Sequence, residues 1–310
     1  MRVIANTTDF KIEEPTAVAI GKFDGIHRGH KELLAHVIQA KREGLKAAVF
    51  TFDTSPEVFF KKVRHRELMT AEEKRACFEK MGIDYVVEYP FNEETARISP
   101  KDYVKEFLLE KMSGRLIVAG EDLSYGDKGA GDANLLVSMA GAHGFSVQII
   151  PKISHNGREI SSTYVREEVR KGEMEMVTEL LGNPYAVSGI IRTGNRIGRT
   201  MGLPTLNLYP EQDKLLPPSG VYFSRVFLEG KAYESVTNIG RKPTIGDTQP
   251  MSVETHLFGF DENAYGKFCL VELLKFDRPE QRFDNIDQLR HAILENVLHA
   301  KQYHKSRKLQ

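Results

Sequence analysis

The sequence predicts two domains: a Rossmann-like α/β domain on a parallel sheet, then an antiparallel β-barrel or sandwich with a C-terminal helix. Three observations support this. The chain has 310 residues, more than one hydrophobic core usually serves. Up to about residue 152, β-branched runs alternate with amphipathic stretches. From residue 185, strand-like runs follow one another with only Gly, Pro and Asn turns between them.

In the first half, five short apolar runs are typical of buried strands: 16–21, 46–52, 85–89, 115–120 and 146–150. Amphipathic stretches lie between them, and each ends in Gly as helices often do: 30–44, 71–82, 99–114 and 132–144. Such short connections between strands and helices imply a parallel sheet with both faces covered.

A helical stretch from Ser162 ends at Gly182-Asn183-Pro184, and this predicts a boundary between domains 1–182 and 183–310. The strands expected after it are 185–193, 220–240, 252–260 and 267–276. The last stretch, 284–305, places Ile286, Leu289, Ile293 and Val297 on one helix face. We expect Asp284 to cap this helix and the helix to pack across the barrel.

Composition restricts the classes of partner. Lys and Arg together number 43, and so do Asp and Glu, so a net charge of zero argues against a nucleic-acid binder. No apolar stretch approaches the length of a membrane span, and no signal peptide is visible. Cys77 and Cys269 lack any partner spacing. We expect a reduced, cytoplasmic protein without a membrane, nucleic-acid or obligatory protein partner.

The first predicted strand runs into GKFDGIHRGH, residues 21–30. A strand, a Gly-rich turn and a helix start form the usual phosphate site of such sheets, because free N–H groups and the helix dipole face the anion. The turn residues are Gly21, Phe23, Asp24 and Gly25, and His27 and His30 can face one ligand. The alternatives are a solvated Gly turn or a zinc site from the two histidines, which lacks an obvious third ligand.

A second cluster, residues 156–167, places Ser161, Ser162 and Thr163 before a helix and Arg166 within it. Hydroxyls at a helix start and an Arg fork bind phosphate oxygens, although alone they equally indicate an N-cap. Their place after the last strand, at the same sheet edge, favours the phosphate site. The Gly- and Asp-rich loop 120–136 follows another strand at that edge, where a substrate-covering element belongs.

GKFDGIHRGH and ISSTYVRE, in this order, resemble the adenylyltransferase half of the prokaryotic bifunctional FAD synthetases. The resemblance implies an HxGH nucleotidyltransferase fold and adenylyl transfer from ATP to FMN with release of pyrophosphate. In this interpretation His27 and His30 donate to the phosphates, while Arg166, Ser162 and Thr163 hold the β,γ end. Asp53 and Asp122 are the flavin-site candidates.

Two segments depart from the family pattern. Thr54-Ser55-Pro56 stands where the family commonly reads PHP, and Leu123 and Tyr125 lie in a loop that many members write DFxFG or NFxFG. Both departures concern the flavin contacts of the first site and leave the phosphate-binding residues intact.

The second domain carries a Gly-rich loop with Gly198 and Gly202, followed by Thr205 and Asn207, whose oxygens suit Mg²⁺ beside phosphates. Glu254 lies on an alternating strand, with Val253 and Thr255 on its other face. A hairpin turn and an exposed strand glutamate are the plain alternatives.

GLPTLN, GVYF, NIGRKPT and VETHL resemble the riboflavin kinase half of the same family, with Leu206 where the family has Ala. The resemblance implies that Thr205 and Asn207 bind Mg²⁺ and ATP phosphates, and that Glu254 is the general base on the riboflavin 5′-hydroxyl. The chain would convert riboflavin to FMN and FMN to FAD. The alternatives are an enzyme with one surviving activity, or a flavin- or nucleotide-binding regulator on an inactive scaffold.

Overall fold

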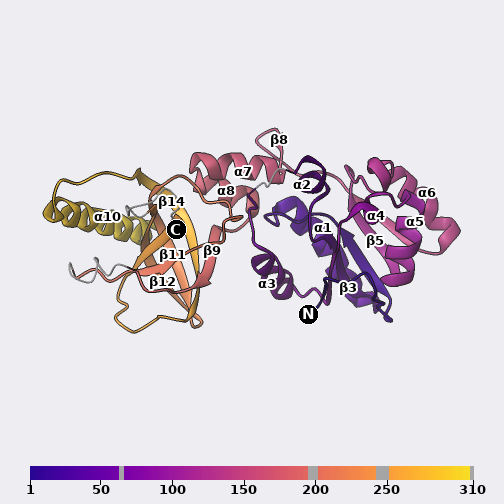
Figure 1. Ribbon diagram of the computed structural model, residues 1–310, viewed down its shortest axis with the longest axis horizontal. Helices are drawn as coiled ribbons and strands as arrows, with labels where there is room; N and C mark the ends of the chain where they lie inside the picture. The colour runs from indigo at the N-terminus through magenta and orange to yellow at the C-terminus, as the bar shows by residue number, and fades with distance from the viewer. Residues whose placement is uncertain (63–65, 195–201, 242–250, 308–310) are drawn as a thin grey trace. The chain divides into compact units, whose positions relative to one another are not determined.

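The computed structural model describes residues 1–62, 66–194, 202–241 and 251–307. Its contacts divide the chain into two units, Met1–Ser162 and Thr163–Gln310 (Figure 1). Helices α7 (Ser162–Lys171) and α8 (Met174–Leu181) therefore group with the second unit. The sequence pattern assigns them to the first domain, so the domain boundary at 182/183 stays a proposal.

The first unit is built on a six-stranded parallel sheet with the order β1-β4-β3-β2-β5-β6. Its strands are β1 (Arg2–Ala5), β2 (Thr16–Ile20), β3 (Lys46–Phe52), β4 (Tyr85–Tyr89), β5 (Gly114–Gly120) and β6 (Ser146–Ile150). The five strands predicted from apolar runs are confirmed. Strand β1 was not predicted, because it pairs with β4 at the sheet edge, is largely exposed and lacks a buried apolar run.

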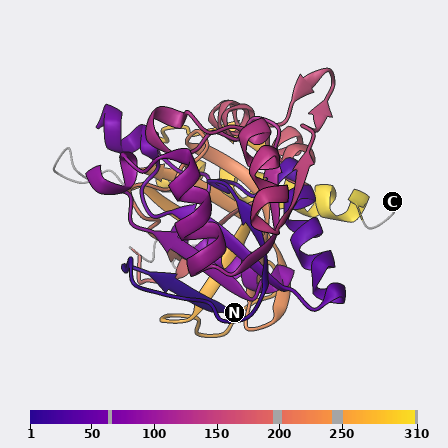
Figure 2. The same cartoon turned by 90° about the vertical axis from the view of Figure 1, so that its right-hand side faces the viewer.

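Helices cover both faces of this sheet (Figure 2). The helical segments of this unit are α1 (Arg28–Gln39), η1 (Ala40–Glu43), α2 (Pro56–Lys61), α3 (Ala71–Met81), α4 (Glu93–Ala96), α5 (Pro100–Asp102), the π-helix η2 (Tyr103–Lys111), η3 (Asp127–Gly129) and α6 (Ala133–His143). Helix α3 begins with a capping box in which Thr70 and Glu73 satisfy each other's backbone N–H groups. Two apolar cores, one on each face, hold the three layers together.

Strand β2 occupies the centre of the sheet, with β3 on one side and β5 on the other. The strand order therefore reverses between β2 and β5. In open α/β sheets such a reversal leaves a crevice at the carboxyl ends of the two strands, and ligands bind there. The loops that begin at Gly21 and at Glu121 meet at this place, so the topology brings two of the motifs together.

The second unit is a curved antiparallel sheet with the order β10-β13-β12-β11-β14-β9. Its strands are β9 (Tyr185–Ile190), β10 (Leu206–Leu208), β11 (Gly220–Leu228), β12 (Lys231–Arg241), β13 (Met251–Leu257) and β14 (Phe268–Pro279). A bridge between Arg192 and Asn207 joins its two edges. The antiparallel barrel expected from the sequence is confirmed as a half-barrel.

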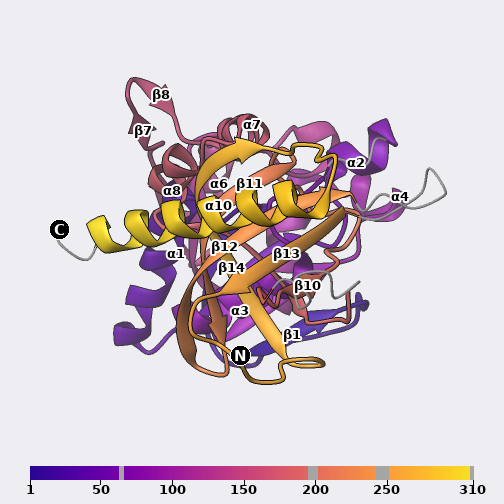
Figure 3. The ribbon, with the colours of Figure 1, turned by 90° about the vertical axis from the view of Figure 1, so that its left-hand side faces the viewer.

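Helix α10 (Ile286–Arg307) lies across the strands of this sheet, as Figure 3 shows. Val297 and Ala300 pack against an apolar patch that includes Val221 and Phe223, as the predicted helix face requires. The expected cap at Asp284 is wrong. The helix begins one residue later, and the Asn285 side chain accepts a hydrogen bond from the Gln288 N–H at 2.9 Å.

The remaining small elements are β7 (Ser154–His155) and β8 (Arg158–Glu159), which form a two-stranded hairpin in the first unit. Among the described residues, no helix is both long and apolar enough to span a lipid bilayer.

Candidate functional site

The loop after β2 has a strained backbone. Phe23, Gly25 and Ile26 have φ angles of 51°, 83° and 41°, in the left-handed region that β-branched side chains such as isoleucine rarely adopt. Burial of Phe23 and Ile26 holds the loop in place. The Asp24 carboxylate accepts hydrogen bonds from the backbone N–H groups of Leu68 and Met69 at 2.9 and 3.2 Å. Such strain is typical of functional sites.

His27 and His30 stack at the start of α1, with ring centroids 3.7 Å apart and planes 18° apart. His27 Nδ1 accepts a hydrogen bond from the His30 N–H at 3.3 Å, which caps the helix and leaves the ring proton on Nε2. Burial lowers the pKa of His27 to about 4, against the charge of Asp122, which raises it. Burial and the His27 charge lower the pKa of His30. Both rings are therefore neutral donors near pH 7.

One ring nitrogen of the two histidines lacks a hydrogen-bond partner among the described residues. His30 Nδ1 is buried and makes no hydrogen bond within the described residues. Buried polar atoms are nearly always paired, so the nitrogen indicates a missing water or ligand. Three or more His, Cys, Asp or Glu side chains that could share a metal ion do not occur together in the described part of the chain. The zinc alternative gains no support from the geometry.

Other motif residues gather at the same loop. The Ser162 hydroxyl donates to the Asp24 carbonyl at 2.8 Å, and Ser161 precedes it. Asp122 lies in the loop after β5, close enough for its charge to act on His27. Thr163 and Arg166 follow on α7, which belongs to the second unit, so their part in this site stays a prediction.

Asp53 directly follows β3 and accepts a hydrogen bond from the Phe91 N–H at 3.0 Å. Phe91 belongs to a cluster of phenylalanine rings, in which Phe52 and Phe59 lie 4.9 and 5.3 Å from the Phe91 ring. Phe60 extends this cluster and is 63% exposed, which is unusual for a large apolar side chain. The cluster offers flat apolar surface beside a carboxylate, a combination that suits an aromatic ring with polar edges.

The two departures from the family pattern have structural roles. Ser55 caps α2 by accepting a hydrogen bond from the Val58 N–H at 3.3 Å. Tyr125 packs on Tyr103 with ring centroids 5.2 Å apart, and its buried hydroxyl makes no hydrogen bond within the described residues. Burial raises the pKa of Tyr125 to about 12. Leu123 packs against the same core.

In the second unit, register places three polar residues side by side. Glu254 of β13 pairs with Asn207 of β10 on one side and with Asn238 of β12 on the other. Val253 and Thr255 are buried, whereas Glu254 is half-buried, as the predicted alternation requires. Residues directly opposite each other in an antiparallel sheet share a face, so the three side chains project to the same side.

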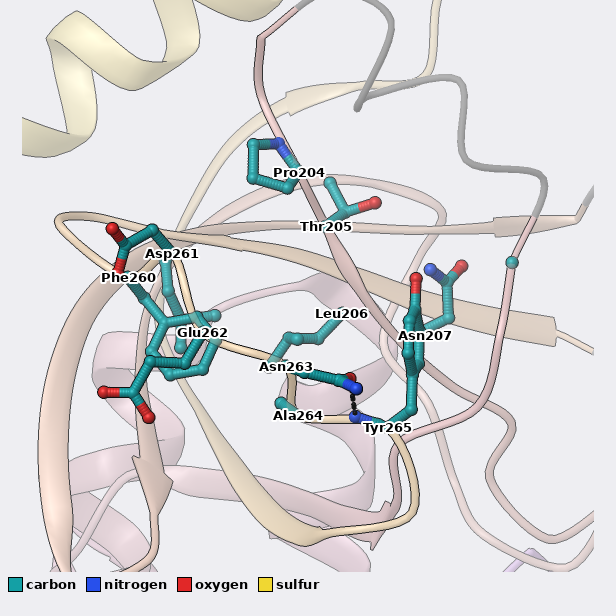
Figure 4. Close-up of a pocket in the computed structure, with 12 residues that line it drawn as sticks. Pro204, Thr205, Leu206, Asn207, Phe260, Asp261, Glu262, Asn263, Ala264 and Tyr265 are labelled. Carbon is teal, nitrogen blue, oxygen red and sulfur yellow. Dashed lines mark hydrogen bonds between the residues drawn. The ribbon is translucent and has the colours of Figure 1, made fainter.

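Two cavities adjoin this row. One, of about 220 Å³, lies between the segment Pro204–Asn207 and the loop from Phe260 to Tyr265, as Figure 4 shows. The other, of about 300 Å³, lies between the sheet and α10 and contains Glu254. Thr205 lines both cavities. Ligands held in the two cavities would therefore approach each other at Thr205.

Two contacts fix the segment that carries Thr205 and Asn207. His256 Nδ1 lies 2.9 Å from the Pro204 carbonyl oxygen; because a carbonyl only accepts, Nδ1 carries the proton. Burial lowers the pKa of His256. Gly194 faces the Asn207 side chain so closely that a Cβ atom there would lie 2.5 Å from its Oδ1.

The remaining residues of the predicted nucleotide loop give less information. Gly202 is exposed and has a φ of 75°. Gly198 lies outside the described residues. Leu206, the departure from the family's Ala, lines the smaller cavity. Asn238, His256 and the 260–265 loop were not predicted as site residues. Asn238 lies in the NIGRKPT string and His256 in the VETHL string, and these strings were the available signal.

Two protein families match the chain, one over its first half and one over its second half. The chain matches the FAD synthetase family over residues 9–164 and the riboflavin kinase family over residues 181–304. It is 33% identical to a bifunctional riboflavin kinase/FMN adenylyltransferase of Listeria monocytogenes, with 91% of this chain and 90% of the relative covered. The Bacillus subtilis relative of the same name is also 33% identical, with 93% and 92% covered. The chain belongs to the bifunctional riboflavin kinase/FMN adenylyltransferase family.

A solved structure supports the fold over the whole chain. A crystal structure described as a macrolide-efflux protein from Streptococcus pneumoniae aligns with a TM-score of 0.85 and 26% identity. It covers 97% of this chain and 98% of its own. In this member of the riboflavin kinase/FMN adenylyltransferase family, the region that matches FAD synthetases contains His27, His30 and Asp53. The region that matches riboflavin kinases contains Glu254 and both cavities.

Proposed function

We propose that this chain phosphorylates riboflavin to FMN in its second unit and adenylylates FMN to FAD in its first, using ATP and Mg²⁺ for both reactions. The observation that carries the proposal is the position of Glu254. It lies in a cavity large enough for a ring compound, directly opposite Asn207, beside a second cavity that shares Thr205. A general base must reach the hydroxyl from which it takes the proton, and this placement supports that role.

In the kinase reaction, the riboflavin 5′-hydroxyl oxygen attacks the γ-phosphorus of ATP. A bond forms between them, the bond to the ADP oxygen breaks, and the hydroxyl proton passes to the Glu254 carboxylate. Phosphoryl transfer depends mainly on alignment and charge neutralisation, so one carboxylate beside the hydroxyl is enough. Phe260 and Tyr265 line the smaller cavity and offer aromatic faces to the adenine.

The oxygen donors of the second unit fit Mg²⁺. This ion favours oxygen ligands and usually takes one or two from the protein, with the rest from phosphates and water. Thr205 and Asn207 supply a hydroxyl and an amide oxygen at the junction of the cavities. We assign them as the residues that hold Mg²⁺ with the ATP phosphates, where the ion neutralises phosphate charge. Gly198 and Gly202 belong to the predicted phosphate loop.

In the adenylyl transfer, an FMN phosphate oxygen attacks the α-phosphorus of ATP and pyrophosphate leaves. The phosphate oxygen is already ionised, so this step needs no base. His27 and His30, at the start of α1, donate N–H hydrogen bonds to the ATP phosphates. The turn formed by Gly21, Phe23, Asp24 and Gly25 presents its backbone to the same phosphates. Ser161, Ser162, Thr163 and Arg166 bind the leaving phosphates. Asp53, with its phenylalanine cluster, and Asp122 contact the flavin.

Product analysis tests the proposal. Purified full-length protein is incubated with riboflavin and Mg²⁺–ATP, and the flavins and nucleotides are separated by chromatography. We expect FMN and ADP first, then FAD and pyrophosphate, and no products when Mg²⁺ is chelated. FMN without FAD would leave only the kinase. Binding of flavin without any product would support the regulator and contradict the proposal.

A further inference from the structure

Asn238 presents a polar side chain to the larger cavity. It lies opposite Glu254, and both line the cavity of about 300 Å³ beneath α10. Its chain neighbours Thr237 and Ile239 are fully buried on the other face of β12. Side chains alternate along a strand, so the Asn238 amide faces the cavity. No hydrogen bond of this amide to another described residue is present.

Strand spacing gives the distance scale of the cavity wall. Adjacent strands lie about 5 Å apart, so Asn238 is one spacing from Glu254, Val221 of β11 is two and Arg278 of β14 is three. A substrate with its terminal hydroxyl at Glu254 can extend along this row, and Asn238 is then the first residue that it passes. Beyond Asn238 the row continues with the apolar Val221 and then with Arg278.

The rest of the wall is suited to a ring. Apolar side chains come from the sheet (Val221, Val236), from α10 (Leu289, Ile293) and from two loops (Leu203, Phe283). Polar side chains complete the lining: His256, Arg278, Glu280, Gln281 and Asn296. Riboflavin combines a flat three-ring system with a chain of hydroxyl groups, the last of which accepts the phosphate. With that hydroxyl at Glu254 and the rings among the apolar side chains, the hydroxyl chain passes Asn238.

We propose that the Asn238 amide binds the hydroxyl groups of the riboflavin side chain and so aligns the terminal hydroxyl with Glu254. A side-chain amide both donates and accepts, which matches hydroxyl groups. The inference rests on the proposed kinase reaction and deepens it by naming the group that holds the reacting chain. Correct alignment of the attacking oxygen is a large part of catalysis in such a transfer.

The test compares two flavins that differ only in the side chain. Lumiflavin has the same three rings as riboflavin but a methyl group in place of the hydroxyl chain. Binding of each to full-length protein is measured by flavin fluorescence, for the wild type and for Asn238→Leu, which keeps the approximate shape and removes the hydrogen bonds. We expect the Kd for riboflavin to rise about 3- to 10-fold, as one neutral hydrogen bond implies, and the Kd for lumiflavin to stay unchanged.

A matched control lies next in the chain. Thr237→Val removes a hydroxyl that bonds Ser224 and Thr255 on the other face, at 2.7 and 2.8 Å. It is expected to lower stability and to leave the riboflavin-to-lumiflavin affinity ratio as in the wild type. If Asn238→Leu does not fold, Asn238→Ser serves instead, with a smaller change in the same ratio.

An unchanged ratio in either Asn238 variant would overturn the inference, and so would equal losses for both flavins, which indicate a structural role or a ring contact. Kinase activity of the wild-type protein distinguishes failure of this inference from failure of the proposed function. Conversion of riboflavin to FMN by the wild type keeps the kinase assignment even if the ratio does not move. Absence of that conversion removes the proposed function itself.

Discussion

The Asn207 side chain lies against the backbone of Gly194, where a Cβ atom would be 2.5 to 2.6 Å from all three of its terminal atoms. Gly194 precedes the predicted phosphate loop, and Asn207 pairs with Glu254. Because a buried amide cannot move freely, the absence of a side chain at Gly194 determines where the Asn207 oxygen lies.

Gly194→Ala should therefore displace Asn207 and impair the kinase reaction. We expect a rise of at least 10-fold in the KM for Mg²⁺–ATP, with adenylylation of supplied FMN unchanged. Gly189→Ala is the matched control, because the nearest atom to its added Cβ, on Leu208, lies at an ordinary 3.8 Å. Steady-state kinetics of both variants decide the matter. Equal kinetics of the two would show that Asn207 adapts.

The stacked histidines predict a separation of the two activities. Replacement of both His27 and His30 by Ala removes the donors at the start of α1, and each donor at a site of developing charge is worth about 10²–10³ in rate. FAD formation from FMN should fall below detection while FMN formation from riboflavin persists. Retained FAD synthesis in the double variant would contradict the assignment of both residues.

The low pKa of His27 predicts how stability depends on pH. The folded protein holds this pKa at about 4, whereas an unfolded chain protonates the ring near 6.5. The unfolded state therefore binds more protons between these values, and the stability present above pH 6.5 is lost as pH falls toward 4. One such group contributes at most about 3 kcal/mol.

Urea denaturation between pH 4 and 7 checks this expectation. His27→Asn keeps a side chain that caps helices well but does not titrate in this range. Its unfolding free energy should fall less steeply than that of the wild type as the solution is acidified. Identical slopes would mean that His27 is not held neutral by burial.

Tyr125 predicts a gain in stability from a deletion. Its buried hydroxyl makes no hydrogen bond within the described residues, and an unpaired buried polar group costs about 1–3 kcal/mol. Tyr125→Phe should raise the urea midpoint of the full-length protein without ligand. Tyr85→Phe is the control, because the Tyr85 hydroxyl donates to Glu14 at 2.8 Å and its loss should lower the midpoint or leave it unchanged. A lower midpoint for Tyr125→Phe would show that the hydroxyl has a partner.

The sequence predicts the buried strands well, but it predicts short or exposed strands and helix caps poorly. Strand β2 is buried at all five positions, so its apolar run is distinctive. Strand β1 exposes its first two residues, and β10 has only three residues, so neither leaves such a run. The cap of α10 was assigned one residue too early, because Asp284 and Asn285 are equally good caps and only the chain path selects between them.

The same limit applies to the candidate sites. His27, His30, Asn207 and Glu254 could be predicted, because each lies in a short motif of consecutive residues. The pairing of Glu254 with Asn238 depends on strand register, and the neutral state of the histidines depends on burial. The Phe260–Tyr265 loop carries no motif, and only the fold brings it to Thr205.

Glu254→Gln tests the central claim most directly, because it keeps the size of the side chain and removes its basic oxygen. The kcat for FMN formation should fall about 10²–10⁴-fold, as the loss of a general base implies, with little change in riboflavin affinity. FAD formation from supplied FMN by the same preparation should match the wild type, which shows that the chain is folded. Kinase turnover within a few-fold of the wild type would contradict the account, since Glu254 would then be only a half-buried strand residue.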